Sequence, residues 1–267
     1  MSSSGLVAGD IVVRFGGIVA LDGARVEAPR GRITGLIGPN GAGKTTIFDL
    51  ISGFQVADEG RVIYDATDVT SLGPDERARL QLVRRFQDAR LFPSLSVFES
   101  ILIALDRRHE ARNMVLNALQ LPQARASERR LRRRADQLID LLELGAYRDK
   151  FVRELSTGLR RITDIACMLA TEPKVLLLDE PSSGIAQAEA ESLGPLLRRV
   201  RVETGCSILI IEHDMPLISR VADELLALDQ GRIVIRGTPD QVLNDRAVVE
   251  SYLGTSEAAI RRSGVKV

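Results

Sequence analysis

The chain has 267 residues, and its 36 Lys and Arg are balanced by 36 Asp and Glu, so the formal net charge is zero. This balance argues against a dedicated nucleic-acid-binding protein, which usually carries a basic excess. Hydrophobic residues make up 45% of the sequence, enough to bury a sizeable core. We therefore expect one large globular domain, or one domain with a subdomain.

No apolar run is long enough to cross a bilayer, and the first ten residues lack the basic and apolar regions of a signal peptide. We expect a cytoplasmic protein in which any membrane role comes through partners. The two cysteines, Cys167 and Cys206, lie in apolar segments. They are expected to be buried free thiols in a reducing compartment.

Residues 10–37 alternate short apolar runs with turns marked by Gly and Pro, which predicts antiparallel strands leading into a buried strand at 33–37. A Gly-rich loop follows. The apolar stretch 45–52 then predicts a helix, which Gly53 is placed to end. Residues 60–70 predict another strand and a turn.

From about 87 to 155 helical patterns dominate, with many arginines and few β-branched runs. Ser96 and Glu99 have the spacing of a capping box before an apolar run at 101–105. Apolar positions at helical spacing predict a further helix over 127–144. We interpret this region as a helical subdomain inserted into an α/β core.

The α/β pattern resumes with a buried strand at 175–178, a helix over about 186–203 and a strand that ends in IIEHD. Another helix is expected over about 215–222, and two short strands joined by a Gln-Gly turn come after it. Because strands alternate with helices, the sheet should be mainly parallel. The sequence shows no internal repeat, which indicates a single unit of this kind.

The sharpest motif fits G-x-x-x-x-G-K-[ST] between a predicted strand and a predicted helix. Its glycines let backbone N–H groups surround phosphate oxygens, and the following helix adds its positive N-terminal end. Lys44 should reach the β- and γ-phosphates of ATP, and the Thr45 hydroxyl should bind Mg²⁺. The candidate ATP-binding residues here are Gly38, Pro39, Asn40, Gly41, Ala42, Gly43, Lys44, Thr45 and Thr46.

The second motif is VLLLDEP, over residues 175–181. Its four apolar residues predict a strand buried on both faces, so Asp179 and Glu180 lie at the strand end where α/β sheets bind ligands. Asp179 is suited to hold Mg²⁺ through water, and Glu180 to act as general base on the attacking water. Pro181 ends the strand because it lacks an N–H.

With these two motifs the chain resembles the ATP-binding cassette (ABC) transporter family. The resemblance implies an α/β fold: a P-loop NTPase core with a mainly parallel sheet and an antiparallel β subdomain, into which a helical subdomain is inserted. We accordingly divide the chain into core (1–86), helical subdomain (87–165), core (166–250) and C-terminal tail (251–267).

Residues 155–159, LSTGL, are similar to the family signature LSGGQ and precede a helical pattern, so Ser156 should begin a helix. The resemblance implies that Ser156 and Gly158 bind the γ-phosphate of ATP held by the opposite subunit. Two positions, 157 and 159, differ from the common form. Ala186 stands where many members have an Asp that bonds across the subunits, which bears on coupling between the two sites rather than on nucleotide binding.

Three single residues complete the resemblance. Gln87 matches the glutamine that senses Mg²⁺ and the attacking water, and His213 matches the histidine that contacts the γ-phosphate. Phe15 matches the aromatic residue that stacks on adenine, with a core phenylalanine as the open alternative. The implied catalytic residues are Glu180, His213, Gln87 and Lys44, and the implied magnesium ligands are Thr45, Gln87 and Asp179.

An arginine-rich run over 127–135 admits either a membrane or nucleic-acid contact or a solvated helix face. The zero net charge and the helical spacing favour the solvated face.

The resemblance implies an ATPase that pairs head to tail with a second cassette, identical or different, and that drives separate permease subunits at the inner face of the cell membrane. Stretches such as RFGGIVALDGA and FQDARLFPSLSVFES resemble the ATP-binding subunits of branched-chain amino-acid importers. A solute-binding protein is then an indirect partner, and no nucleic-acid partner is expected. The alternatives are the ATPase of an exporter, such as that for lipopolysaccharide, and a non-transport cassette ATPase.

Overall fold

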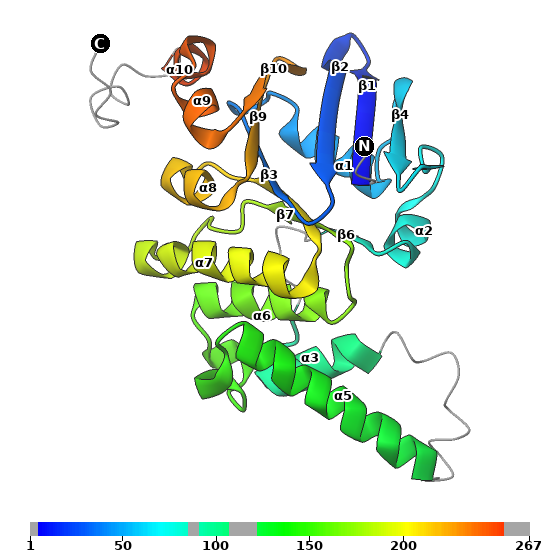
Figure 1. Ribbon diagram of the computed structural model, residues 1–267, viewed down its shortest axis with the longest axis vertical. Coiled ribbons are helices and arrows are strands. Elements are labelled where there is room, and N and C mark those ends of the chain that lie inside the picture. Colours follow the sequence, from blue (N-terminus) through cyan, green and yellow to red (C-terminus); the bar gives the residue numbers. More distant parts are fainter. Residues whose placement is uncertain (1–4, 85–90, 107–121, 254–267) are drawn as a thin grey trace. The chain divides into compact units, whose positions relative to one another are not determined.

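The computed structural model describes residues 5–84, 91–106 and 122–253 (Figure 1). The chain separates into two compact units. The first unit comprises residues 1–84, 174–181 and 205–267, and the second comprises residues 85–173 and 182–204. The predicted domain boundaries at 86, 165 and 250 stay predictions.

The first unit contains an antiparallel sheet in the order β2-β1-β4-β5. Its strands are β1 (Gly5–Phe15), β2 (Ile18–Pro29), β4 (Glu59–Tyr64) and β5 (Thr67–Asp68). β1 pairs with both β2 and β4, with register shifts in each ladder. The antiparallel strands predicted before the Gly-rich loop and the strand predicted after it are confirmed.

A second sheet in the same unit has the order β10-β9-β3-β8-β7-β6. The strands are β3 (Ile33–Ile37), β6 (Leu82–Arg84), β7 (Val175–Asp179), β8 (Ser207–Ile211), β9 (Glu224–Asp229) and β10 (Arg232–Gly237). All neighbours pair in parallel except β9 and β10, which form a hairpin. The mainly parallel sheet is confirmed, and β3, β7 and β8 are buried along their whole length, as strands covered on both faces are.

The described part of the first unit has the helices α1 (Lys44–Ser52), α2 (Pro74–Arg79), α8 (Met215–Val221), α9 (Pro239–Leu243) and α10 (Arg246–Leu253). The buried side of α1 joins one core cluster with residues of both sheets. Helix α8 lies on the other face of the parallel sheet, where a Cβ on Gly35 would be 2.9 Å from Ile218. As predicted, Gly53 ends α1 in a left-handed conformation, with φ of 83°.

Arg77 of α2 fixes the end of α1. Its side chain is fully buried and donates to the carbonyls of Leu50 and Ile51 at 2.6 and 2.8 Å. It also donates to the carbonyls of Thr70 and Leu72 at 2.9 Å each. Burial lowers the pKa of Arg77. The cation therefore satisfies carbonyls at the negative end of the helix dipole of α1.

The second unit is helical, with α3 (Val97–Asp106), α5 (Pro122–Leu141), α6 (Thr157–Leu169) and α7 (Gln187–Thr204). Two 3₁₀ turns, Gly145–Tyr147 and Val152–Glu154, precede α6. The predicted capping box is present, because the Ser96 N–H donates to Glu99 Oε2 at 2.8 Å and the Glu99 N–H donates to Ser96 Oγ at 3.1 Å. Helix α5 ends three residues before the predicted 144, where Glu143 adopts a positive φ of 58°.

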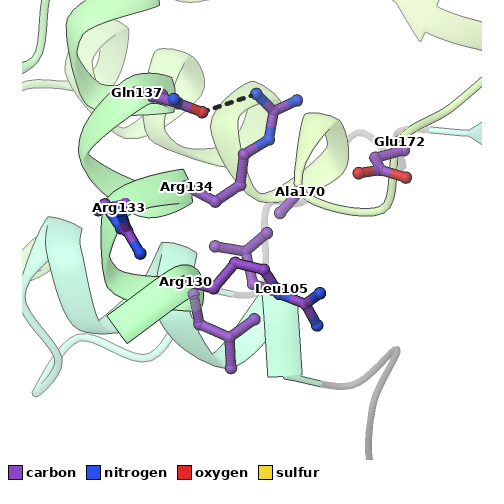
Figure 2. Close-up of a pocket in the computed structure, with 8 residues that line it drawn as sticks. Leu105, Arg130, Arg133, Arg134, Gln137, Ala170 and Glu172 are labelled. Atoms are coloured by element: carbon purple, nitrogen blue, oxygen red, sulfur yellow. Dashed lines mark hydrogen bonds between the residues drawn. The ribbon is translucent and has the colours of Figure 1, made fainter. Parts of the chain in front are cut away.

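The arginine-rich run lies on α5 and forms a mostly solvated face, as predicted. Arg132 pairs with Glu128 at 2.9 Å one turn away. Other arginines of the run line a pocket of about 690 Å³, and Arg134 donates to Gln137 there at 3.1 Å (Figure 2). Within the ranges that the structure describes, no helix combines the length and the apolar character that a bilayer crossing needs.

Both cysteines are free thiols, as predicted. Cys206 is buried, and burial raises the pKa of the partly covered Cys167 to about 12. Cys167 therefore lacks the thiolate character of a reactive cysteine.

Replacing Arg77 by Met should destabilise the first unit by about 2–4 kcal/mol, because four carbonyls lose their donor in a buried site. Arg79→Met, an exposed change on the same helix, should alter stability by less than about 0.5 kcal/mol. Urea unfolding followed by circular dichroism measures both. Equal stability of the two variants would contradict the anchoring role of Arg77.

Candidate functional site

The phosphate loop joins the end of β3 to the start of α1. Gly38, Gly41 and Gly43 have positive φ values of 155°, 84° and 108°. A Cβ on Gly38 would lie 2.1 Å from the carbonyl oxygen of Leu228, so only glycine fits where β9 approaches the loop. No side chain caps α1 at Gly43, which leaves the first amides of the helix facing an anion-binding position.

Lys44 is folded back over this loop. Its Nζ donates to the carbonyl oxygens of Gly38 at 2.7 Å and of Pro39 at 2.8 Å, and the residue is buried. Burial lowers the pKa of Lys44, whereas the negative charges of Glu180 and Asp179 act to raise it. The two sequence motifs are thus electrostatically coupled in the folded chain.

Asp179 ends β7 and is 3% exposed. Arg84, at the end of β6, lies with Nη2 3.5 Å from Asp179 Oδ2, pairs with Asp49 of α1 and donates to Ser52 Oγ at 3.1 Å. Burial raises the pKa of Asp179, and Arg84 opposes this rise. Sequence reasoning missed Arg84, since one arginine after two apolar residues carries no distinct signal.

Glu180 and His213 form the second part of the acidic site. Glu180 Oε1 lies 3.1 Å from His213 Nε2, and the side chains are 31% and 38% exposed. The Glu180 N–H donates to the Ile211 carbonyl at 2.9 Å, which ties the residue to the end of β8. Its φ of 45° is rare for a side-chain-bearing residue and is typical of functional sites. This strained backbone could not be predicted from the residues around Glu180.

Phe15 and Thr45 belong to the same unit as the loop. Phe15 ends β1 and is 50% exposed, so the alternative of a core phenylalanine is wrong. Thr45 is exposed on the first turn of α1, whereas Thr46 is partly covered. Gln87 lies outside the described residues, as does the predicted tail beyond residue 253.

The signature-like residues lie in the second unit. Ser156 caps α6 as predicted, since its Oγ accepts from the Leu159 N–H at 3.2 Å. The same hydroxyl donates to Glu189 Oε1 of α7 at 2.6 Å, and a Cβ on Gly158 would lie 2.4 Å from the Glu189 carboxylate. This acidic neighbour was not predicted. Ala186, before α7, is exposed.

Comparison with known proteins identifies the family. A family model described as ABC transporter matches residues 21–183. The chain belongs to the ATP-binding cassette transporter family. A second model, for the branched-chain amino acid ATP-binding cassette transporter, matches residues 236–258 of this cassette.

Among curated relatives, the cassette is 33% identical to the high-affinity branched-chain amino acid transport ATP-binding protein BraF of Pseudomonas aeruginosa, over 95% of this chain and 99% of the relative. It is 32% identical to the corresponding protein LivG of Escherichia coli K12, with the same coverage. Among solved structures, the ADP conformation of MJ1267, an ATP-binding cassette of an ABC transporter, aligns with a TM-score of 0.80 and 30% identity over 95% of this chain and 100% of that chain.

Family membership confirms the predicted fold and the predicted ATPase function. The α/β fold is a P-loop NTPase cassette, and the chain is an ATP-binding and ATP-hydrolysing subunit of an ABC transporter. The family model covers the phosphate loop and the acidic pair, which are also the residues that the structure couples through Lys44.

Replacing Arg84 by Met should destabilise the chain by about 3 kcal/mol near neutral pH, because Asp179 would remain as a buried carboxylate without its cation. Burial already raises the pKa of Asp179, and removing Arg84 raises it further. At low pH the carboxyl is neutral in both the folded and the unfolded states, so the deficit should grow as pH rises through the folded-state pKa.

Urea unfolding at pH 5 and pH 8 tests this expectation, with the exposed Arg61→Met as a control expected to change stability by less than about 0.5 kcal/mol at either pH. A deficit that shrinks as pH rises would contradict the account of Asp179.

Proposed function

We propose that this cassette powers the import of a small solute, branched-chain amino acids or close relatives, through separate permease subunits. The observation that carries the ATP chemistry is the buried Lys44, held on the phosphate loop within the field of Asp179 and Glu180. The match of residues 236–258 to the importer-type model supports the solute class.

ATP binding uses the loop and the first turn of α1. The amides after Gly41 approach the phosphates, and Lys44 exchanges its two carbonyl partners for β- and γ-phosphate oxygens. This exchange favours binding because the phosphates offer a buried ammonium full charge compensation, whereas carbonyls offer dipoles only. The exposed ring of Phe15 stacks on adenine.

Magnesium fits the residues present. The Thr45 hydroxyl, the Asp179 carboxylate and the Gln87 side chain supply oxygen atoms, which are the donors that Mg²⁺ prefers. Asp179 is almost fully buried, and the 3.5 Å separation from Arg84 exceeds that of a close hydrogen bond. A second cation beside this carboxylate would therefore offset its burial. When bound, Mg²⁺ neutralises charge that develops on the phosphates.

Hydrolysis is assigned to Glu180. Its carboxylate takes a proton from the attacking water, whose oxygen bonds to the γ-phosphorus as the bond from that phosphorus to the bridging oxygen of ADP breaks. His213 lies 3.1 Å from Glu180 and holds that carboxylate in place. His213 also contacts the γ-phosphate, and Lys44 stabilises the charge on the transferred group.

Full activity requires a second cassette, identical or different, placed head to tail. Ser156 and Gly158 of one chain then face the γ-phosphate bound by the other. Because the Ser156 hydroxyl donates to Glu189, the incoming phosphate must replace that carboxylate as the acceptor. Closing and opening of this pair moves permease subunits at the inner face of the membrane, and a solute-binding protein delivers the cargo outside.

Glu180→Gln should retain MgATP binding within about twofold of wild type and lose at least about 100-fold of ATP turnover, because the amide cannot accept the proton of water. Phosphate release and fluorescence titration measure the two properties. Glu203→Gln, an exposed change, is the charge-matched control and should hydrolyse like wild type. If Glu180→Gln hydrolyses ATP at the wild-type rate, the assignment of Glu180 as general base is wrong.

The solute class is tested by transport. The cassette is reconstituted in proteoliposomes with the permease subunits encoded beside its gene. The solute-binding protein is supplied on the opposite side, and uptake of labelled leucine is followed with and without ATP on the cassette side. ATP-dependent leucine uptake is expected, and none with Glu180→Gln. Export of a lipid cargo instead would support the exporter alternative. A gene neighbourhood without any permease would support the non-transport alternative.

A further inference from the structure

The C-terminal helix α10 touches the phosphate loop. The N–H of Gly38, the first residue of the loop, donates to the hydroxyl of Tyr252. Tyr252 is on the last turn of α10, more than 200 residues further along the chain. In Figure 1, α9 and α10, coloured orange to red, lie beside β10.

The helix that carries Tyr252 is fixed at its start and packed along one face. The Asp245 carboxylate accepts from the Ala247 N–H at 2.9 Å, which fixes the start of α10. Val248, one helical turn before Tyr252, is buried at 3% exposure, so the face that carries both residues packs inward. Burial raises the pKa of Tyr252 to about 12, and the phenol therefore stays neutral at physiological pH.

Gly38 is restrained at each of its backbone groups. Its N–H meets Tyr252, its carbonyl accepts from Lys44 Nζ at 2.7 Å, and the missing Cβ leaves room for the Leu228 carbonyl. When nucleotide takes Lys44 away from the carbonyl, the contacts with Tyr252 and β9 remain. The hydroxyl thus holds one end of the loop while the lysine changes partners.

We infer that Tyr252 is a positioning residue for ATP, which keeps the start of the phosphate loop in its binding conformation from the C-terminal segment of the chain. This inference rests on the proposed role of the loop in ATP binding. It also assigns a task to the segment 236–258, which the importer-type family model matches and in which Tyr252 lies.

The expected effect is on affinity more than on turnover. Without the hydroxyl, the Gly38 amide loses its acceptor and the loop populates other conformations. The apparent affinity for ATP then falls in proportion to the fraction of molecules whose loop is in the binding conformation. Tyr252→Phe should raise the KM for ATP and the dissociation constant of MgATP by about three- to tenfold, the range that loss of one hydrogen bond predicts. Once ATP is bound, kcat should change by less than about twofold.

Tyr64→Phe is the matched control. The Tyr64 hydroxyl is buried in the same unit and has no hydrogen-bond partner among the residues that the structure describes. Its removal should therefore leave the KM unchanged. Hydrogen exchange of the peptide covering residues 36–44, without nucleotide, gives a second readout: exchange at Gly38 should speed up in Tyr252→Phe and not in Tyr64→Phe.

Lys44→Ala distinguishes a failure of the proposed ATP-binding role of the loop from a failure of the role of Tyr252. If Lys44→Ala binds MgATP like wild type, the proposed role of the loop fails. If Lys44→Ala loses binding while Tyr252→Phe keeps wild-type affinity and wild-type exchange at Gly38, the loop assignment stands and the role of Tyr252 is overturned. A drop in kcat with unchanged KM in Tyr252→Phe would likewise overturn it.

Discussion

The first unit depends on one constraint, the close approach of β9 to the phosphate loop at Gly38. The Leu228 carbonyl occupies the space that any side chain would need. The backbone of Gly38 also adopts a positive φ of 155°, and two further glycines of the loop have positive φ values. Such a backbone lets successive N–H groups face a bound anion. Lys44 then folds back over the loop, into the field of the two carboxylates at the end of β7.

Buried charges are arranged around this constraint so that each has an opposite charge or a set of dipoles. Arg77 satisfies the carbonyls at the end of α1, and Arg84 joins α1 to Asp179. Removing one member of such a set leaves the remaining buried charge without compensation, and the folded state is destabilised. These residues therefore matter for stability as well as for function. The C-terminal half of α1 is thus held by two arginines, Arg77 and Arg84.

Motifs with a fixed backbone requirement were predictable from the sequence. The glycine pattern and the VLLLDEP strand located the loop, the acidic pair and the parallel sheet, because strand periodicity and glycine conformation are local properties. Contacts between segments far apart in the sequence were not predictable. They include the pairs Arg84–Asp179, Ser156–Glu189 and Gly38–Tyr252. The hydrogen bond between Ser156 and Glu189 spans 33 positions, and that between Gly38 and Tyr252 spans 214. Short elements such as β6 and α9 were also missed, since they span too few residues to show a period.

The residues of this cassette indicate its ATP chemistry more directly than they indicate the transported solute. In the proposed function, ATP contacts loop amides and Lys44 near two carboxylates, whose positions follow from the fold, whereas the imported solute contacts only the proposed partners. What distinguishes one cassette from another must then lie in segments outside the shared core. The C-terminal segment is such a place. It matches the family model for the branched-chain amino acid ATP-binding cassette transporter, and its Tyr252 accepts a hydrogen bond from the first residue of the phosphate loop. A segment that is characteristic of one subgroup thus contacts the loop where the shared ATP chemistry is proposed to take place.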